Sequence, residues 1–408
     1  MKNKKKNKDM LIPVIIVTMG AVECETQIKR LLADGRVFPV LVLNGCALDR
    51  QQLFIDLVGS KGHCIILPEN LGGAGGFRAG MQYCLDSDYP DSLPVWLLDD
   101  DAEINDNTLS ALLEAAVQLE SDGIKWGAIG SVMIDSLFRL RINESGAKVN
   151  WKTGRLIGLN AGKSIKSLPL EELIPCEYCA AASLLTRVGV IREIGIFADI
   201  FIHYDDVDWC LRMRKSGYYI FCAPKSFFYH PCGFLEKPFT WICYYDVANQ
   251  LWFYRKYHFS ILSIVFWNFC GGVYLHLWGL HKQGNLFFRG LIDGYFDRPR
   301  LLRHYLKFEP LRELPETVMN SPVIFASCNL RNMVYCRKIF KKNVRFFKLS
   351  KKFIIRNLQW ILLYFFCLIN FRHSILIDDY FRCLKVLLPL FFRKTFFYHS
   401  VLNKGIYR

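Results

Sequence analysis

Four short apolar runs alternate with amphipathic stretches over the first 125 residues. The runs are rich in β-branched residues and end in polar turns, which predicts buried parallel strands. They cover Leu11–Thr18, Val37–Asn44, His63–Pro68 and Val95–Leu98. The intervening stretches predict helices over 21–34, Gly76–Leu85 and Leu109–Ser121. This alternation predicts an α/β fold, with a mostly parallel sheet and helices on both faces.

The pattern changes after residue 125. Residues 125–200 predict short strands and turns, and helices are expected at Arg187–Ile194 and Asp206–Ser216. An aromatic-rich stretch from Trp241 to about Tyr257 predicts a further helix. We therefore divide the chain into a polar tail (1–10), an α/β domain (11–240), a helical extension (241–330) and a basic, aromatic, helical C-terminal region (331–408).

One segment raises the question of a membrane span. Phe259–Leu280 has 22 residues without Asp, Glu, Lys or Arg, which is long enough to cross a bilayer. It also contains Asn268, a Gly-Gly pair and His276, which favour a packed or interfacial helix. Both alternatives stay open, and the pattern favours the second.

The distribution of positive charge along the chain bears on whether the protein binds nucleic acid or a membrane. The net charge is +15, and residues 331–408 hold 17 Lys and Arg against two Asp, while residues 1–8 add five Lys. The segment between these two regions is therefore slightly acidic, which argues against nucleic-acid binding. A basic, aromatic C-terminal region is suited to an anionic membrane surface, although a solvated helical tail would show the same composition.

The cysteines predict a reducing compartment. Many of the 15 cysteines lie inside apolar runs, and no secretory leader is recognised, so we expect reduced thiols in a cytoplasmic protein. Cys176 and Cys179 form one Cys-x-x-Cys pair. Without a second pair or nearby His ligands, this pair is a weak signal for zinc.

An acidic triplet follows the fourth predicted strand. Because alternate side chains at a strand end point the same way, Asp99 and Asp101 are placed to converge on one ion. Mg²⁺ or Mn²⁺ bound by one or two carboxylates would also hold substrate phosphates and neutralise a leaving diphosphate. An acidic turn that caps the next helix would show the same residues.

A glycine-rich turn precedes the helix predicted at Gly76. It runs Asn70-Leu71-Gly72-Gly73-Ala74-Gly75-Gly76-Phe77-Arg78 and matches neither the dinucleotide-binding fingerprint nor the P-loop. Glycines allow close backbone approach, and a helix N-terminus attracts phosphate. A tight strand-to-helix turn is the alternative.

A second acidic cluster opens the helix near residue 206. Asp205 and Asp206 are either helix caps or a source of the general base for an acceptor hydroxyl. Asp208 and Trp209 are candidates for acceptor contacts, and His230 follows a short aromatic run. A lone His at such a position is more often structural than a ligand.

In this order, the motifs resemble family 2 glycosyltransferases of the GT-A (Rossmann-like) fold, over about residues 11–300. The likeness is greatest to bacterial galactofuranosyltransferases and rhamnosyltransferases. It is carried by the glycine turn, the acidic triplet, Tyr204–Gly217, Tyr244–Asn249 and Gly290–Gly294. The chain departs from the family at Leu43, where an Asp is usual, and at Ala248, where an Arg is usual.

The resemblance implies an inverting, metal-dependent transfer of a sugar from a UDP- or dTDP-linked donor to a glycan or lipid-linked acceptor. It implies that Asp206 is the base and that Mn²⁺ or Mg²⁺ is held by Asp99, Asp101 and His230. Expected donor contacts come from the strand ends, the glycine turn and the acidic triplet: Thr18, Asn44, Asn70, Gly72, Gly73, Gly75, Gly76, Arg78 and Asp100. Expected acceptor contacts are Asp205, Asp208 and Trp209.

Two details and two rival functions stay open. Arg212 and Arg214 either pair with these carboxylates or are surface charges of the helix. The basic, aromatic C-terminal region favours a protein at the cytoplasmic face of the inner membrane. The rival functions are a basic nucleic-acid-binding protein and an inactive relative that acts as an assembly partner.

Overall fold

The structure is a computed structural model that describes residues 10–231, 242–277 and 281–298. The chain divides into two compact units, Met1–Phe340 and Lys341–Arg408. The second unit lies wholly outside the described residues, and so do the lysine-rich residues 1–8 and the whole of the basic C-terminal region (331–408) expected from the sequence. The domain boundaries at residues 10, 240 and 330 therefore stay predictions.

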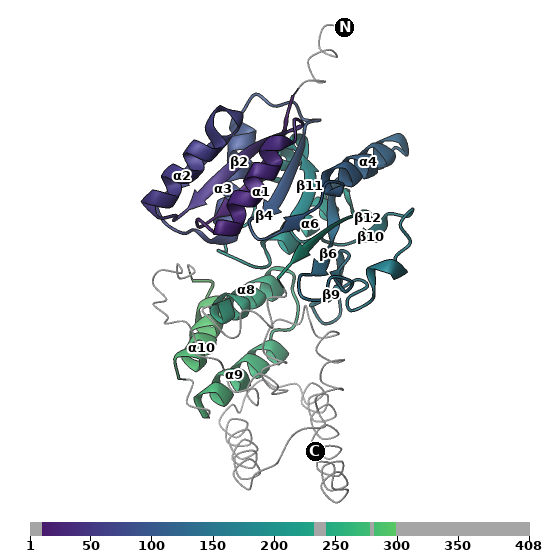
Figure 1. Cartoon of the computed structure of the whole chain (residues 1–408). Coiled ribbons are helices and arrows are strands. Elements are labelled where there is room, and N and C mark those ends of the chain that lie inside the picture. The colour runs from purple at the N-terminus through teal and green to yellow at the C-terminus, as the bar shows by residue number, and fades with distance from the viewer. Residues whose placement is uncertain (1–9, 232–241, 278–280, 299–408) are drawn as a thin grey trace, which may run out of the picture. The chain divides into compact units, whose positions relative to one another are not determined.

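A single large sheet forms the centre of the α/β part (Figure 1), with strand order β10-β12-β6-β11-β4-β1-β2-β3. One half is parallel and contains β1 (Ile12–Thr18), β2 (Val37–Asn44), β3 (His63–Leu67) and β4 (Pro94–Asp99). The other half is mixed. In it, β11 (Ser183–Arg187) runs antiparallel to both β4 and β6 (Trp126–Asp135), and β12 (Tyr219–His230) runs parallel to β6.

Short strands complete the mixed half. β10 (Ile174–Cys176) and β5 (Glu103–Ile104) pair antiparallel with β12, and β7 (Ile142–Glu144) pairs with β6. A separate hairpin joins β8 (Ala147–Asn150) to β9 (Arg155–Gly158). Short 3-10 helices cover Gly59–Lys61 and Ile165–Ser167.

Helices pack on both faces of the sheet because its strands are apolar on both sides. Along β1, Ile15 belongs to one core, whereas its neighbours Val14 and Ile16 belong to the other. One core includes α3 (Gly72–Asp86), α5 (Val188–Ile194) and α6 (Asp205–Lys215). The opposite core includes α1 (Val22–Ala33), α2 (Leu48–Val58) and α4 (Thr108–Ser121). The predicted α/β fold with helices on both faces is confirmed.

Three helices follow the α/β part: α8 (Ile242–Lys256), α9 (Leu262–Leu277) and α10 (His281–Tyr295). Buried Asp293 of α10 accepts hydrogen bonds from the Tyr244 hydroxyl of α8 and from Arg289, at 2.8 and 2.7 Å. Glycines allow these helices to approach closely, since a Cβ at Gly290 would lie 2.8 Å from the Tyr244 carbonyl. Among the described helices, none combines the length and hydropathy needed to cross a membrane.

Candidate functional site

Asp99, Asp101 and His230 form a cluster where β4 and β12 end. The Nε2 atom of His230 lies 3.0 Å from an oxygen of Asp101 and 3.6 Å from an oxygen of Asp99. One ligand atom from each of the three residues lies within 4.8 Å of the others, and each side chain is half-buried. The structure therefore brings together three residues that the sequence predicts as metal ligands.

Hydrogen bonding fixes how His230 faces the carboxylates. Its Nδ1 atom lies 3.0 Å from the Pro231 carbonyl, which can only accept, so Nδ1 donates and Nε2 points at the aspartates. Burial alone would lower the pKa of His230, but hydrogen bonds to Asp101 and Asp99 outweigh burial and raise it to about 10. In the absence of a cation, the imidazole is thus protonated and neutralises part of the negative charge.

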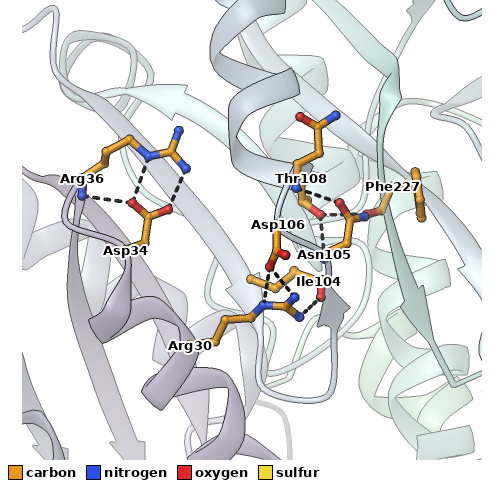
Figure 2. Close-up of polar contacts among 9 residues, drawn as sticks. Arg30, Asp34, Arg36, Ile104, Asn105, Asp106, Thr108 and Phe227 are labelled. Carbon is orange, nitrogen blue, oxygen red and sulfur yellow. Dashed lines mark hydrogen bonds and ion pairs between the residues drawn. The ribbon is translucent and has the colours of Figure 1, made fainter.

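The connection from Asp99 to α4 is anchored on two sides (Figure 2). Asn105 and Thr108 both donate to the Phe227 carbonyl of β12, at 2.9 Å each. On the other side, Arg30 of α1 contacts the Ile104 carbonyl and the exposed carboxylate of Asp106. The two bonds to Phe227 hold the start of α4 against β12, the strand that carries His230.

The cluster fits a divalent cation by the chemistry of its donor atoms. Two carboxylates and one imidazole nitrogen converge, and the second nitrogen of the imidazole is held by a carbonyl, as in protein metal sites. The pKa of Cys24 in α1 is raised to about 12, mainly by burial and to a smaller extent by the charge of Asp100. Asp100 thus lies near α1. Adjacent members of the triplet therefore have different environments.

Two buried asparagines hold the glycine-rich turn. The Asn44 side chain at the end of β2 donates to the Asn70 side chain and to the Gly72 carbonyl, at 3.1 and 2.9 Å. Its carbonyl oxygen accepts from the Leu71 N–H, while that of Asn70 accepts from the Gly72 N–H. Both asparagines are expected donor contacts, and the structure shows them fixing the turn from within the protein.

The glycines of this turn have different surroundings. A Cβ at Gly72, where φ is +75°, would lie 2.0 Å from the Phe201 carbonyl, and one at Gly76 would lie 2.2 Å from a Val17 methyl carbon. A Cβ at Gly75 would meet the Leu71 side chain. Only at Gly73, among these four, is there no heavy atom within 4 Å. Three of the glycines therefore serve close packing, and Gly73 borders open space.

Two further expected donor contacts are engaged by the protein. The Arg78 guanidinium donates to the Phe197 carbonyl at 2.9 Å. The hydroxyl oxygen of buried Thr18 accepts from the Gly20 and Ala21 N–H groups at the start of α1. These bonds give both residues a structural role.

A strained turn precedes α6. Phe201, His203 and Tyr204 all have positive φ, between 64° and 72°, which costs a non-glycine residue about 1–3 kcal/mol. Contacts from two sides hold them there. The Ala74 N–H of α3 donates to the Phe201 carbonyl, and His203 pairs with Asp246 of α8 at 2.6 Å. We call residues 200–204 the left-handed turn.

Helix α8 makes two more contacts with the left-handed turn. The Asn249 amide donates to the carbonyls of Ile200 and Ile202, at 2.9 and 2.6 Å. The Tyr245 ring stacks on Phe201 with centroids 4.3 Å apart. The turn therefore joins the glycine-rich turn, α6 and α8.

The second acidic segment forms the first turn of α6. Asp205 and Asp206 are 8% and 6% exposed, and an Asp206 oxygen accepts from the Val207 N–H at 2.7 Å. Asp208 is fully buried, and its carboxylate contacts the Arg212 guanidinium, the Lys256 ammonium and the Tyr257 hydroxyl. Carboxylates near a helix N-terminus are also favoured by the helix dipole.

Two expected acceptor residues are buried within the protein. Asp208 is 0% exposed and has three polar partners, and Trp209 is 0% exposed with its indole N–H donating to the Gly195 carbonyl. These contacts hold α6 in place, and a contact of either residue with an acceptor stays a prediction. The question about the arginines is answered: Arg212 pairs with Asp208, and Arg214 pairs with Glu177.

The Cys-x-x-Cys pair is an internal feature. The sulfurs of Cys176 and Cys179 lie 3.4 Å apart, and both residues are buried. Among the described residues, the cluster at Asp99 is the only group of three or more His, Cys, Asp or Glu whose ligand atoms converge. The sulfurs of this pair are thus not part of such a cluster.

Several residues of the site could not be identified from the sequence. Gln27 of α1 donates to the Asp99 carbonyl at 3.0 Å, and the Pro231 carbonyl orients His230. Arg139 makes a two-bond contact with Glu103, two residues after Asp101. Of these contacts, the sequence hints only at that of Gln27, a polar residue on the apolar face of its helix. The sequence does not show which atom its amide contacts.

No protein-family model matches the chain, and no curated protein matches it either. Solved structures do resemble it, and three of them are described here. The crystal structure of GalNAc-T7 with UDP, GalNAc and Mn²⁺ is 11% identical with a TM-score of 0.47, covering 71% of this chain and 57% of that one. The chain thus spans little more than half the length of that protein.

The other two are bacterial proteins, each 13% identical and each covering 52% of this chain. A protein of Desulfovibrio desulfuricans G20 named as a nucleotide-diphospho-sugar transferase has a TM-score of 0.29, over 80% of its length. Mannose-6-phosphate isomerase of Helicobacter pylori has a TM-score of 0.28, over 86% of its length. Because all three TM-scores lie below 0.5, we draw no conclusion about function from them.

Proposed function

We propose that this chain is a metal-dependent glycosyltransferase of the family 2 type that takes its sugar from a nucleoside-diphosphate donor. The observation that carries the proposal is the convergence of Asp99, Asp101 and His230 at the end of β4, in an α/β sheet. In parallel sheets, ligands bind at the carboxyl ends of the strands. The motif resemblance described above supports the same activity.

The proposed chemistry assigns one role to each cluster. A divalent cation held by Asp99, Asp101 and His230 would neutralise charge on the leaving diphosphate. Asp206 takes the proton of the acceptor hydroxyl, whose oxygen forms a bond to the anomeric carbon. The bond from that carbon to the diphosphate breaks on the opposite face, so the configuration is inverted and the nucleoside diphosphate leaves.

The donor nucleotide is proposed to lie over the glycine-rich turn. Gly73 borders open space there, and the α3 N-terminus favours phosphate. Asp100 and Asp205 stay proposed as donor and acceptor contacts. Galactofuranose and rhamnose are the favoured sugars, and UDP or dTDP the favoured carriers, on the basis of the resemblance alone.

The donor set favours Mn²⁺ over Mg²⁺. Mg²⁺ takes oxygen ligands in near-ideal octahedral geometry, whereas the third ligand here is an imidazole nitrogen. Location at the cytoplasmic membrane surface and a lipid-linked or glycan acceptor belong to the proposal as well. They depend on the basic C-terminal region, which lies outside the described residues.

A binding and hydrolysis screen of nucleotide sugars with Mn²⁺ or Mg²⁺ tests the proposal. Wild-type protein should bind one donor only when the cation is present. Asp206→Asn should keep this binding and lose turnover, because it keeps the shape of the side chain and removes the base. Asp106→Asn is the matched control, since Asp106 lies in the connection after the acidic triplet and its side chain is 94% exposed.

Two results would contradict the proposal. Folded protein that binds no nucleotide sugar in the presence of the cation would exclude the transferase. Turnover that survives in Asp206→Asn would remove Asp206 as the base. An RNA or heparin pull-down with and without residues 331–408 would then test the nucleic-acid alternative.

A further inference from the structure

A short loop after β6 presents apolar side chains to solvent. Leu137, Phe138 and Leu140 are 59%, 51% and 58% exposed. Two hydrogen bonds shape the start of the loop, since buried Asp135 accepts from the Leu137 and Phe138 N–H groups at 2.9 and 3.3 Å. Exposed apolar side chains that lie together are typical of a binding surface.

This loop borders a shallow, open groove of about 500 Å³. The other border is residues 162–164, joined to the loop by the bridge between Arg141 and Ser164 and by a bond from the Ile165 N–H to the Leu140 carbonyl at 2.9 Å. The groove is lined by seven residues: Phe138, Arg139, Leu140, Arg141, Gly162, Lys163 and Ser164.

The lining combines positive charge with apolar surface. Three of the seven residues are cations, and none is acidic. Arg139 is partly neutralised by Glu103, while Lys163 contacts a neutral group, the Asn160 side chain, at 2.9 Å. The Arg141 guanidinium lies 5.8 Å from the centre of the Phe138 ring. A ligand that matches this lining carries an anionic group next to an apolar chain.

The groove lies beside the metal-ligand cluster. The Ser136 N–H donates to the His230 carbonyl at 3.1 Å, so the loop begins in contact with a member of the cluster. The Arg139 guanidinium lies 4.5 Å from the centre of the Tyr229 ring and bonds Glu103. In the sheet, β6 and β12 lie on the other side of β4 from β2, whose end holds the glycine-rich turn.

We propose that this groove binds a phosphate-bearing amphiphile, with the phosphate at Lys163 beside the two arginines and the apolar chain along Phe138 and Leu140. Its role as the acceptor's binding site rests on the proposed function, and the observation that favours it is the contact between the start of the loop and His230. Binding of the amphiphile itself does not depend on transferase activity.

Three probes separate the two parts of the recognition: octyl phosphate, octyl glucoside and inorganic phosphate, each below any micelle-forming concentration. Binding to the full chain is measured by calorimetry. Octyl phosphate should bind at least about tenfold more tightly than either of the others, because only it satisfies charge and apolar surface together. Equal binding of inorganic phosphate or of octyl glucoside would overturn the proposal, as would no binding of octyl phosphate.

Variants locate the probe. Lys163→Gln should weaken octyl phosphate about fivefold and leave octyl glucoside unchanged, whereas Leu140→Ser should weaken both. The matched controls are Lys148→Gln and Leu170→Ser, exposed residues outside the groove lining, which should change neither. Controls that weaken octyl phosphate as much as the groove variants would overturn the assignment.

One measurement keeps this proposal separate from the metal site. Octyl phosphate should bind equally well to wild type, to Asp206→Asn and to protein treated with EDTA. If EDTA abolishes its binding, the phosphate sits on the cation and the groove is not its site. If octyl phosphate binds but no nucleotide sugar does, the groove is supported and the proposed transferase is contradicted.

Discussion

Two acidic segments of this chain look alike in sequence and differ in their surroundings. In the first, Asp99 and Asp101 are half-buried at a strand end and share a single imidazole. In the second, Asp208 is fully buried and contacts Arg212, Lys256 and Tyr257. A carboxylate with protein cations around it stabilises the fold, whereas carboxylates that converge with one His are placed for an external cation. The side chains that surround each carboxylate, and not the acidic sequence pattern, distinguish the two segments.

The largest effect should come from Asp101→Asn. Losing this charge removes a ligand from the proposed metal site, so turnover should fall by about 10³-fold, which corresponds to about 4 kcal/mol. The variant should still fold cooperatively because the side chain is partly exposed, although it loses the His230 contact that stabilises the metal-free protein. Steady-state kinetics and thermal unfolding test both parts, with Asp106→Asn as control.

The opposite result is expected for Asp208→Asn. The change leaves the Arg212 and Lys256 charges without their anion, so the free energy of unfolding should fall by about 3 kcal/mol. Urea unfolding measures the loss, and Mn²⁺ affinity of the folded fraction should be unchanged. A stable variant with weakened Mn²⁺ binding would erase the distinction between the two acidic segments.

The glycine-rich turn allows the same distinction to be made within one motif. Gly76→Ala places a methyl group against Val17 and should destabilise the protein by about 2 kcal/mol. In Gly73→Ala the new methyl group points into open space, and alanine favours the helix more than glycine does. This variant should therefore stabilise the protein by up to about 1 kcal/mol. If Gly73 borders the donor, its Ala variant should nevertheless bind nucleotide sugar more weakly, which calorimetry would detect.

A pH dependence tests the His230 ligand by itself. Since the pKa of His230 is raised to about 10, the metal-free protein holds a proton on Nε2 that a cation must displace. Mn²⁺ affinity should therefore rise about tenfold per pH unit through the neutral range. In His230→Gln this contribution to the slope should vanish. A pH-independent affinity in wild type would show that His230 is not a ligand.

Whereas Mn²⁺ affinity should rise with pH, the folding stability of the metal-free protein should fall. A pKa raised on folding contributes stability that is complete below the ordinary value of about 6.5 and is lost as the pH rises through about 10. Metal-free wild type should thus lose stability over this range relative to His230→Gln. Thermal unfolding in EDTA measures the difference.

The sequence predicts elements best where local pattern and burial coincide. The predicted strand Val37–Asn44 has the same bounds as β2, because a short apolar run that is buried on both faces is typical of a parallel strand. The pattern predicts no helix at α2, where only Phe54 and Val58 are buried and the apolar face is short. Helix α3 begins at Gly72, four residues before the predicted start, since packing against the left-handed turn and β1 overrides the poor helix propensity of glycine.

For the site, the sequence indicates the ligands but not the supporting contacts. Asp99 and Asp101 follow from a strand end, which a pattern shows, whereas the ligand role of His230 follows only from the family resemblance. The burial of Asp208 depends on Lys256 and Tyr257, about fifty residues further along the chain, and no local pattern encodes that contact. The same holds for the groove beside His230, which forms from two separate loops.

The left-handed turn has a consequence for synthesis on the ribosome. Phe201, His203 and Tyr204 hold an unfavourable backbone shape that Asp246 and Asn249 of α8 help to impose. A nascent chain that ends before α8 lacks those contacts, so the strained backbone before Asp205 and Asp206 can relax. We therefore expect the acidic pair to reach its final geometry only after α8 has been made, which would keep an incomplete chain inactive.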